Sequence, residues 1–193
     1  EQKLIGSFFK NLDEQIDKQG KKVEKLKNLK NSYLSEMFPA EGELSPKRRF
    51  KGFTEPWEEK KLGEVTYKID YGLNAPAGRY DGENKYIRIT DIDETTRIFL
   101  KTDLTSPECN LEIADNYLLK NKDILFARTG ASAGKSYIYR KSDGKVYFAG
   151  FLIRFRIDNN HSDEFIYQYT FTKHYKKFVL ITSQRSGQPG INS

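Results

Sequence analysis

The first 38 residues carry a heptad repeat, and this pattern constrains the fold more than any other feature of the chain. Apolar and aromatic residues recur at alternating steps of four and three, which predicts a helix with one apolar stripe. Gln19 and Lys30 are the polar residues that fall on the stripe. Such a stripe calls for a partner helix, although packing on the chain's own domain is the alternative. The predicted helix-pairing residues are Ile5, Phe9, Leu12, Ile16, Val23, Leu26, Tyr33 and Met37.

The helix is expected to stop at Pro39, and Gly20 inside it costs about 1 kcal/mol relative to alanine. Residues 39–56 are predicted to form a linker, because prolines and glycines punctuate them. The basic run at residues 47–49 is either a solvated loop or a contact with a phosphate. These limits predict a helix over 1–38, a linker over 39–56 and a globular domain over 57–193.

From Trp57 onward, short β-rich runs alternate with turn signals, which predicts a mixed α/β domain with a largely antiparallel sheet. The whole chain is therefore expected to be of the α+β class. Asp143-Gly144 lies between two of the runs and predicts a hairpin. Residues 165–181 are predicted to form a helix, with Asp163 as its N-cap. The predicted strands cover residues 64–69, 85–89, 97–100, 124–128, 136–139, 146–148 and 152–157.

The net charge of +6 indicates either a solvated basic surface or a polyanionic partner. Cys109 is the only cysteine, so a disulfide within the chain is impossible, and a reducing, cytoplasmic location is expected. No apolar run approaches the roughly 20 residues that span a bilayer. Both ends of the sequence are expected to be cuts within a longer chain, and the globular domain is expected to be incomplete at its C-terminus.

The turn from Gly130 to Ser136 resembles a phosphate-binding P-loop, but three residues separate its glycines where a P-loop has four. A β-rich run also follows it where a P-loop requires a helix. A nucleotide-binding enzyme is therefore a weak alternative, and the turn either contacts a DNA backbone or is a plain hairpin loop. The two histidines are isolated, and the acidic residues 91–94 are expected to form a solvated turn. We therefore expect no metal site and no catalytic residues.

With catalytic and metal sites set aside, the basic and aromatic residues are the remaining candidates for function, and they predict a basic, aromatic-rich surface. Arginine reads guanine through two hydrogen bonds, asparagine and glutamine read adenine, and lysine suits phosphates. The candidate DNA-binding residues are Lys68, Tyr71, Asn74, Arg79, Tyr80, Arg88, Arg128, Thr129, Ser132, Lys135, Arg140, Lys145, Arg185 and Gln188.

Several segments together resemble the specificity subunit of Type I restriction–modification systems. Residues 5–16, 26–30 and 34–39 are similar to the conserved helix of that family. Residues 49–64 are similar to the entry into its target-recognition domain, and residues 123–132 and 186–192 to motifs inside that domain. The resemblance covers nearly the whole chain.

The resemblance implies a non-catalytic, sequence-specific DNA-binding subunit. The family has two recognition domains separated by two long antiparallel helices, and each domain reads one half of a split target. This chain looks like the central helix plus the second recognition domain. Self-association through the helix is therefore expected, giving an antiparallel pair that favours a symmetric, interrupted target.

The family also implies the partners: double-stranded DNA, modification (methyltransferase) subunits and restriction/translocase subunits. S-adenosylmethionine, ATP and Mg²⁺ would belong to those subunits and not to this chain. A coiled-coil assembly module whose globular part contacts protein is the remaining alternative. Steep salt dependence of DNA binding would separate a DNA-binding subunit from such a module.

Overall fold

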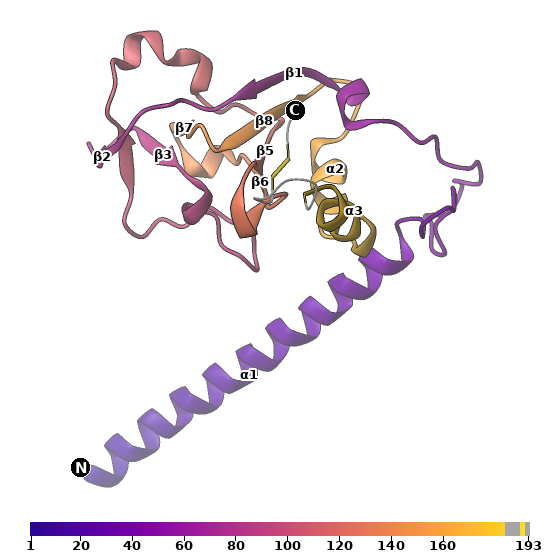
Figure 1. Cartoon of the computed structure of the whole chain (residues 1–193). Coiled ribbons are helices and arrows are strands. Elements are labelled where there is room, and N and C mark those ends of the chain that lie inside the picture. Colours follow the sequence, from indigo (N-terminus) through magenta and orange to yellow (C-terminus); the bar gives the residue numbers. More distant parts are fainter. Residues whose placement is uncertain (184–189, 192–193) are drawn as a thin grey trace. The chain divides into compact units, whose positions relative to one another are not determined.

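The computed structural model describes residues 1–183, 190 and 191. The chain divides into two compact units, Glu1–Trp57 and Glu58–Ser193 (Figure 1). The first consists of one long helix and the segment that follows it. The second contains all of the strands and two shorter helices. The fold class predicted from the sequence, a long helix followed by a mostly antiparallel α/β domain, is confirmed.

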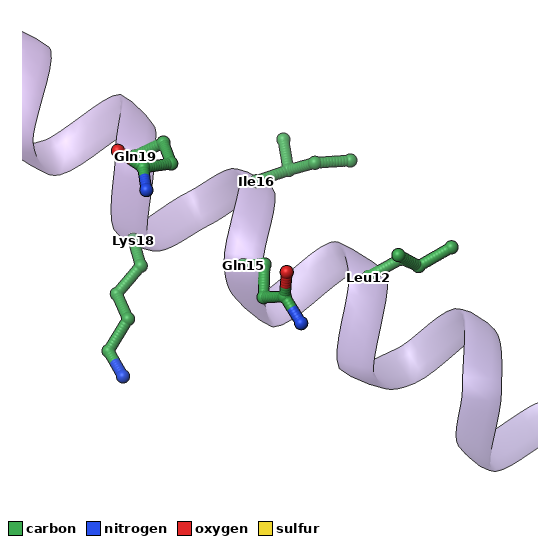
Figure 2. Close-up of a pocket in the computed structure, with 5 residues that line it drawn as sticks. All are labelled: Leu12, Gln15, Ile16, Lys18 and Gln19. Atoms are coloured by element: carbon green, nitrogen blue, oxygen red, sulfur yellow. The ribbon is translucent and has the colours of Figure 1, made fainter.

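The helix α1 runs without interruption over Gln2–Glu36, through Gly20. It ends slightly before Pro39, with Met37 as its C-cap, whose N–H donates to the carbonyl of Tyr33. None of its residues is buried by the described part of the chain. Leu12 and Ile16 project from the same side of the helix, and nothing in the close-up covers them (Figure 2).

The segment after α1 makes contacts back to the end of the helix. Arg48 returns to the end of the helix, where its backbone N–H donates to the carbonyl of Glu36 at 2.8 Å. The Arg48 side chain also forms an ion pair with the Glu36 carboxylate at 2.5 Å and lies over the ring of Tyr33. Phe38 and Trp57 pack edge to face, with ring centroids 6.1 Å apart. Residues 37–57 therefore form a small cap on the helix terminus.

The second unit is built around a four-stranded antiparallel sheet in the order β1-β8-β5-β6. Two shorter pairs flank this sheet: β2 with β4 is antiparallel, and β3 with β7 is parallel. The strands are β1 Thr66–Tyr71, β2 Ala77–Arg79, β3 Lys85–Ile87, β4 Thr105–Pro107, β5 Asp123–Ala127, β6 Ser136–Ile138, β7 Val146–Phe148 and β8 Leu152–Ile157. The helices are α2 Asp163–Tyr169 and α3 Lys173–Ser183. Short 3₁₀ helices connect several strands: η1 Leu62–Val65, η2 Ile89–Asp91, η3 Leu111–Ile113, η4 Asp115–Tyr117, η5 Gly130–Ser132 and η6 Lys141–Asp143.

Both faces of the sheet are covered, and β5 is buried along its whole length. Because side chains alternate along a strand, Leu125 points to one face while Ile124 and Phe126 point to the other. Leu125 belongs to a cluster with residues of β3, β7 and their connections. Ile124 and Phe126 belong to a second cluster, which includes Tyr167 of α2 and the ring of Tyr175 of α3. Because β5 is buried on both faces, residues 124–127 are all apolar.

The hairpin predicted at Asp143-Gly144 is wrong. Strand β6 pairs with β5, whereas β7 leaves the sheet and pairs in parallel with β3. The intervening residues form η6, and the buried Asp143 accepts a hydrogen bond from the hydroxyl of Tyr137 at 2.8 Å. The turn is thus anchored to the core and does not connect two paired strands. The strand predicted at 97–100 is also absent; only a single bridge joins Ile92 to Phe99.

The helix predicted over residues 165–181 is two helices, broken at residues 170–172. The hydroxyl of Thr170 donates to the carbonyl of Tyr167 at 2.6 Å. The hydroxyl of Thr172 accepts from the N–H of Tyr175 at 3.2 Å and so caps the start of α3. Threonine side chains that bond the backbone in this way compete with helix continuation. The N-cap of α2 is Ser162 and not Asp163.

Candidate functional site

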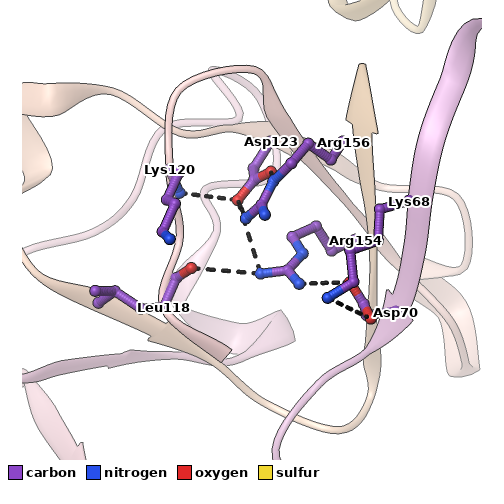
Figure 3. Close-up of polar contacts among 7 residues, drawn as sticks. All are labelled: Lys68, Asp70, Leu118, Lys120, Asp123, Arg154 and Arg156. Carbon is purple, nitrogen blue, oxygen red and sulfur yellow. Dashed lines mark hydrogen bonds and ion pairs between the residues drawn. The ribbon is translucent and has the colours of Figure 1, made fainter. Parts of the chain in front are cut away.

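A buried polar network around Arg154 joins three neighbouring strands of the sheet (Figure 3). Arg154 on β8 forms an ion pair with Asp70 on β1, its register partner. Its guanidinium also donates to the carbonyl of Leu118 at 3.3 Å and lies 3.8 Å from the carboxylate of Asp123. The ring of Phe148 covers it, with 4.8 Å between guanidinium carbon and ring centroid. The side chain is only 1 % exposed.

Asp123, at the start of β5, is the completely buried carboxylate of this network. It accepts hydrogen bonds from Arg156 at 2.5 and 2.8 Å and from the backbone N–H of Lys120 at 2.8 Å. A one-residue slip of β8 would carry both of its arginines to the opposite face, leaving Asp123 unpaired. The network therefore fixes the register of the sheet. It belongs to the scaffold, because neither Asp123 nor Arg154 is open to solvent.

A group of exposed and half-buried side chains lies where β5 and β1 end and β8 begins. We call it the Arg128 cluster; its members are Tyr71, Asn74, Arg128, Thr129 and Phe151. The guanidinium carbon of Arg128 lies 4.8 Å from the centroid of the Tyr71 ring. The N–H of Arg128 donates to the carbonyl of Phe151 at 2.9 Å, and the Phe151 side chain is 65 % exposed.

Two glycines allow the cluster to assemble. A Cβ on Gly72 would lie 2.1 Å from the carbonyl oxygen of Ala149, so only glycine fits there. The N–H of Gly150 donates to the carbonyl of Leu73 at 2.8 Å. The chain after β1 is thereby held against the turn between β7 and β8, and the backbone of Asn74 lies beside Gly150, the residue before Phe151.

Most of the other predicted DNA-binding cations are already paired with carboxylates. The pairs are Lys68 with Asp70 at 3.4 Å, Arg88 with Asp91 at 2.8 Å, Arg140 with Glu164 at 2.6 Å and Lys145 with Glu83 at 3.5 Å. By contrast, Arg128 forms no ion pair with any described carboxylate, and the aromatic ring beneath it fixes its orientation. Arg128 is therefore an oriented arginine without a described carboxylate partner, and it has the capacity to bind an external anion or a base edge.

The remaining predicted residues lie elsewhere. Arg79 is exposed at the end of β2, beside the half-buried Tyr80. The Lys135 side chain is 4 % exposed and is paired with Glu94, which also accepts a hydrogen bond from Ser132. Arg185 and Gln188 lie outside the described residues. The structure thus brings Arg128 into contact with Tyr71, while Thr129 follows Arg128 in the chain and the backbone of Asn74 lies beside Gly150.

Phe151 was not among the predicted site residues, because it lies one residue before the strand predicted at 152–157. The signal that could have identified it is the glycine before it. A glycine next to a strand often marks a close backbone approach, and Gly150 makes one here with the carbonyl of Leu73. Exposed aromatic rings of this size are found at binding surfaces more often than isolated aliphatic residues are.

The structure bears on the P-loop-like turn and on the acidic residues 91–94. Strand β6 follows the turn at residues 130–135, as the sequence analysis expected, so the turn does not lead into a helix. The carboxylates of residues 91–94 are separately engaged: Asp91 with Arg88, Asp93 with the N–H of Thr96 and Glu94 with a lysine. Among the described residues, no group of three or more His, Cys, Asp or Glu side chains could hold a metal ion. Within that same part of the chain, no helix combines the length and apolar character that crossing a membrane requires.

Comparisons with known proteins agree with one another. The model of the Type I restriction modification DNA specificity domain matches residues 54–193. One solved chain, from work on complex assembly and conformational transition of the type I R-M system, aligns with a TM-score of 0.54 at 14 % identity. This alignment covers 94 % of the present chain and 43 % of the other. The HsdS subunit from Thermoanaerobacter tengcongensis aligns with a TM-score of 0.50 at 14 % identity, over 85 % of this chain and 37 % of that one. The chain thus spans less than half the length of either, and no curated protein matches its sequence.

Proposed function

The chain belongs to the family of Type I restriction modification DNA specificity domains, and we propose from this that it binds double-stranded DNA sequence-specifically and gives a restriction–modification complex its target. The observation that carries the proposal is the family match over the same unit that presents the Arg128 cluster. A stacked arginine, an exposed amide at Asn74 and an exposed phenylalanine are the side-chain types that read base edges and contact thymine methyl groups. The net charge of +6 favours a phosphate backbone as partner.

Selection of bound duplexes from a random pool tests this proposal, because it needs no knowledge of the target. We expect an enriched motif and an affinity that falls steeply as salt rises. Arg128→Ala should weaken binding about tenfold, the range of one specific arginine contact. Arg140→Ala is the matched control, since its charge is already neutralised by Glu164. Recovery of no motif, together with binding insensitive to salt, would reject the function.

The catalytic steps are proposed to reside in other subunits. Methyl transfer would require a modification subunit with S-adenosylmethionine, and translocation and cleavage would require a restriction subunit with ATP and Mg²⁺. The present chain would supply target choice alone. Methylation of a selected duplex should therefore require both this chain and a modification subunit, and activity of either one alone would contradict the assignment.

The exposed stripe of α1 is proposed to pair with the same helix of a second copy. An antiparallel arrangement suits the charges. It can place Lys30 opposite Leu12 of the partner subunit and Asp13 opposite Lys27 of the partner subunit. A parallel, in-register pair would instead bring the two copies of Lys30 together in the seam, which is unfavourable. Such a two-fold pair would present two recognition units to a symmetric, interrupted target.

Light scattering measures the pairing directly. Leu12→Asp and Leu26→Asp each place a charge in the seam, so we expect monomers. Lys18→Asp introduces the same side chain away from the stripe and serves as the control, which should keep the mass of a dimer. A monomeric wild-type protein, or an unchanged mass in both seam variants, would exclude helix-mediated pairing.

A further inference from the structure

The lysine of the P-loop-like turn is an internal residue. The Lys135 amine donates to the carbonyl of Ile92 at 3.0 Å and to the carboxylate of Glu94 at 2.5 Å. Its side chain is 4 % exposed, whereas that of Glu94 is 69 % exposed. A buried ammonium needs such partners, because an unpaired charge in the interior is strongly unfavourable. Lys135 therefore cannot contact a phosphate unless it first breaks its hydrogen bonds to Ile92 and Glu94.

Glu94 holds the turn at a second point. The same carboxylate oxygen that contacts Lys135 accepts a hydrogen bond from the hydroxyl of Ser132 at 3.1 Å. The loop that carries Glu94 is itself fixed, since Asp93 accepts hydrogen bonds from the N–H groups of Thr95 and Thr96 at 3.1 and 2.6 Å. Glu94 thus connects its own loop to both ends of the segment 132–135.

The opposite side of the turn rests on α3. The hydroxyl of Tyr175 donates to the carbonyl of Gly134 at 2.8 Å. Gly134 has a φ of +79°, and a Cβ there would lie 2.5 Å from the side chain of Val179. At the base of the turn, Ala127 exchanges backbone hydrogen bonds with Gly134 and Lys135, each 2.8 Å long. These hydrogen bonds close a loop whose first residue is Arg128.

We propose that Glu94 and Lys135 are positioning residues, which lock the segment from Arg128 to Ser132 in the conformation that meets DNA. This inference rests on the proposed function, because the segment contains Arg128 and Thr129 of the Arg128 cluster. The lock requires an acidic residue close to a surface that is proposed to bind a polyanion. That placement is electrostatically unfavourable for DNA binding, so a role in holding the loop accounts for it better than direct contact does.

The two possible roles of Glu94 predict opposite changes in the affinity for duplex DNA, so Glu94→Ala distinguishes between them. If Glu94 were only a surface charge, its removal would tighten duplex binding by reducing repulsion. If it positions the loop, its removal should weaken binding to the selected duplex about fivefold, equivalent to about 1 kcal/mol. Glu83→Ala is the matched control, because Glu83 is similarly exposed and pairs with Lys145 at 3.5 Å. The control should bind as tightly as wild type or more tightly.

Lys135→Met separates positioning from phosphate contact. Methionine keeps the length and apolar stem of the side chain but removes the charge. Positioning predicts weaker binding with the same salt dependence as wild type. A phosphate contact predicts a salt slope smaller by about 0.9, the value for one lost contact. A reduced slope, or wild-type affinity in both variants, overturns the proposal.

Hydrogen exchange provides a measurement that does not depend on DNA. The N–H groups of Ala133 and Lys135 donate within the turn at 3.0 and 2.8 Å, so their exchange reports its closure. We expect Glu94→Ala to accelerate both, while amides of β8 exchange as in wild type. Unchanged exchange at Ala133 and Lys135 would show that no lock exists. Failure of the wild-type protein to bind any duplex, with the lock intact in this measurement, would instead reject the DNA-binding function.

Discussion

Replacing Asp123 with alanine should destabilise the second unit more than any exposed ion pair could. Asp123 is completely buried and neutralises Arg156 directly, while Arg154 lies 3.8 Å away. Alanine would remove the carboxylate and leave the 13 %-exposed side chain of Arg156 without its bidentate acceptor. Asp70 can still pair with Arg154, so the loss falls mainly on Arg156.

The magnitude follows from burial. Removing one partner of a buried ion pair costs about 3–5 kcal/mol, because the remaining charge is left uncompensated. The lost hydrogen bond from the N–H of Lys120 contributes to the same cost. For a unit of this size, such a loss lowers the melting temperature by roughly 10–20 °C. Glu83→Ala, which breaks an exposed pair, should cost less than about 1 kcal/mol.

Urea denaturation followed by near-ultraviolet circular dichroism measures the difference, since the buried tyrosines of the second unit, Tyr86, Tyr137, Tyr147 and Tyr167, contribute to that signal. A double variant, Asp123→Ala with Arg156→Met, should recover part of the loss, because it removes the stranded charge as well. A loss below about 1 kcal/mol in Asp123→Ala would refute the reasoning, because that is the range of an exposed pair. Equal losses in the single and double variants would show that the cost lies in packing and not in charge.

Three further outcomes are expected. Gly72→Ala should destabilise the second unit in urea denaturation, because its Cβ would lie 2.1 Å from the carbonyl oxygen of Ala149, whereas Gly63→Ala, with open space around it and no positive φ, should cost less. Hydrogen bonds from the Asn84 side chain and from two backbone N–H groups lower the pKa of Asp81 from 3.8 to about 2. Asp81 therefore stabilises the fold above pH 4, and this contribution should disappear as the pH falls from 4 to 2, which a comparison with Asp81→Asn across that range would reveal. Arg185→Ala should weaken duplex binding more than it lowers thermal stability, as comparison of binding and melting curves would show.

The long helix and most strands could be predicted because their signals are local. Heptad spacing and β-branched runs depend only on neighbouring residues. Strands β2 and β4 were missed because Ala77-Gly78-Arg79 and Thr105-Ser106-Pro107 have little strand propensity. Their pairing depends on Ser106, a buried residue whose hydroxyl accepts from the N–H of Asp81 at 3.0 Å, twenty-five residues away. No local pattern carries that information.

The site was predictable only in part for the same reason. Arg128 and Thr129 follow a predicted strand, so their position at its end could be expected. The burial of Lys135 could not, because its partners Ile92 and Glu94 lie more than forty residues earlier in the sequence. The pairing of Arg88 with Asp91 was not predictable either, because it depends on the short turn η2 directly after β3, where the sequence predicted a strand up to residue 89.

The pairing of β1 with β8 has a consequence for the order of events during synthesis. Thr66 meets Ile157, so the sheet cannot close until the ribosome has made nearly all of the second unit. The helix is complete at Glu36, and at about 5–20 residues per second it therefore waits roughly 6–24 s for that closure. During this interval the apolar stripe of α1 is already formed, whereas the sheet of the second unit is still open. Chains growing side by side on one messenger are thus expected to join by their helices before either can recognise a partner through its sheet.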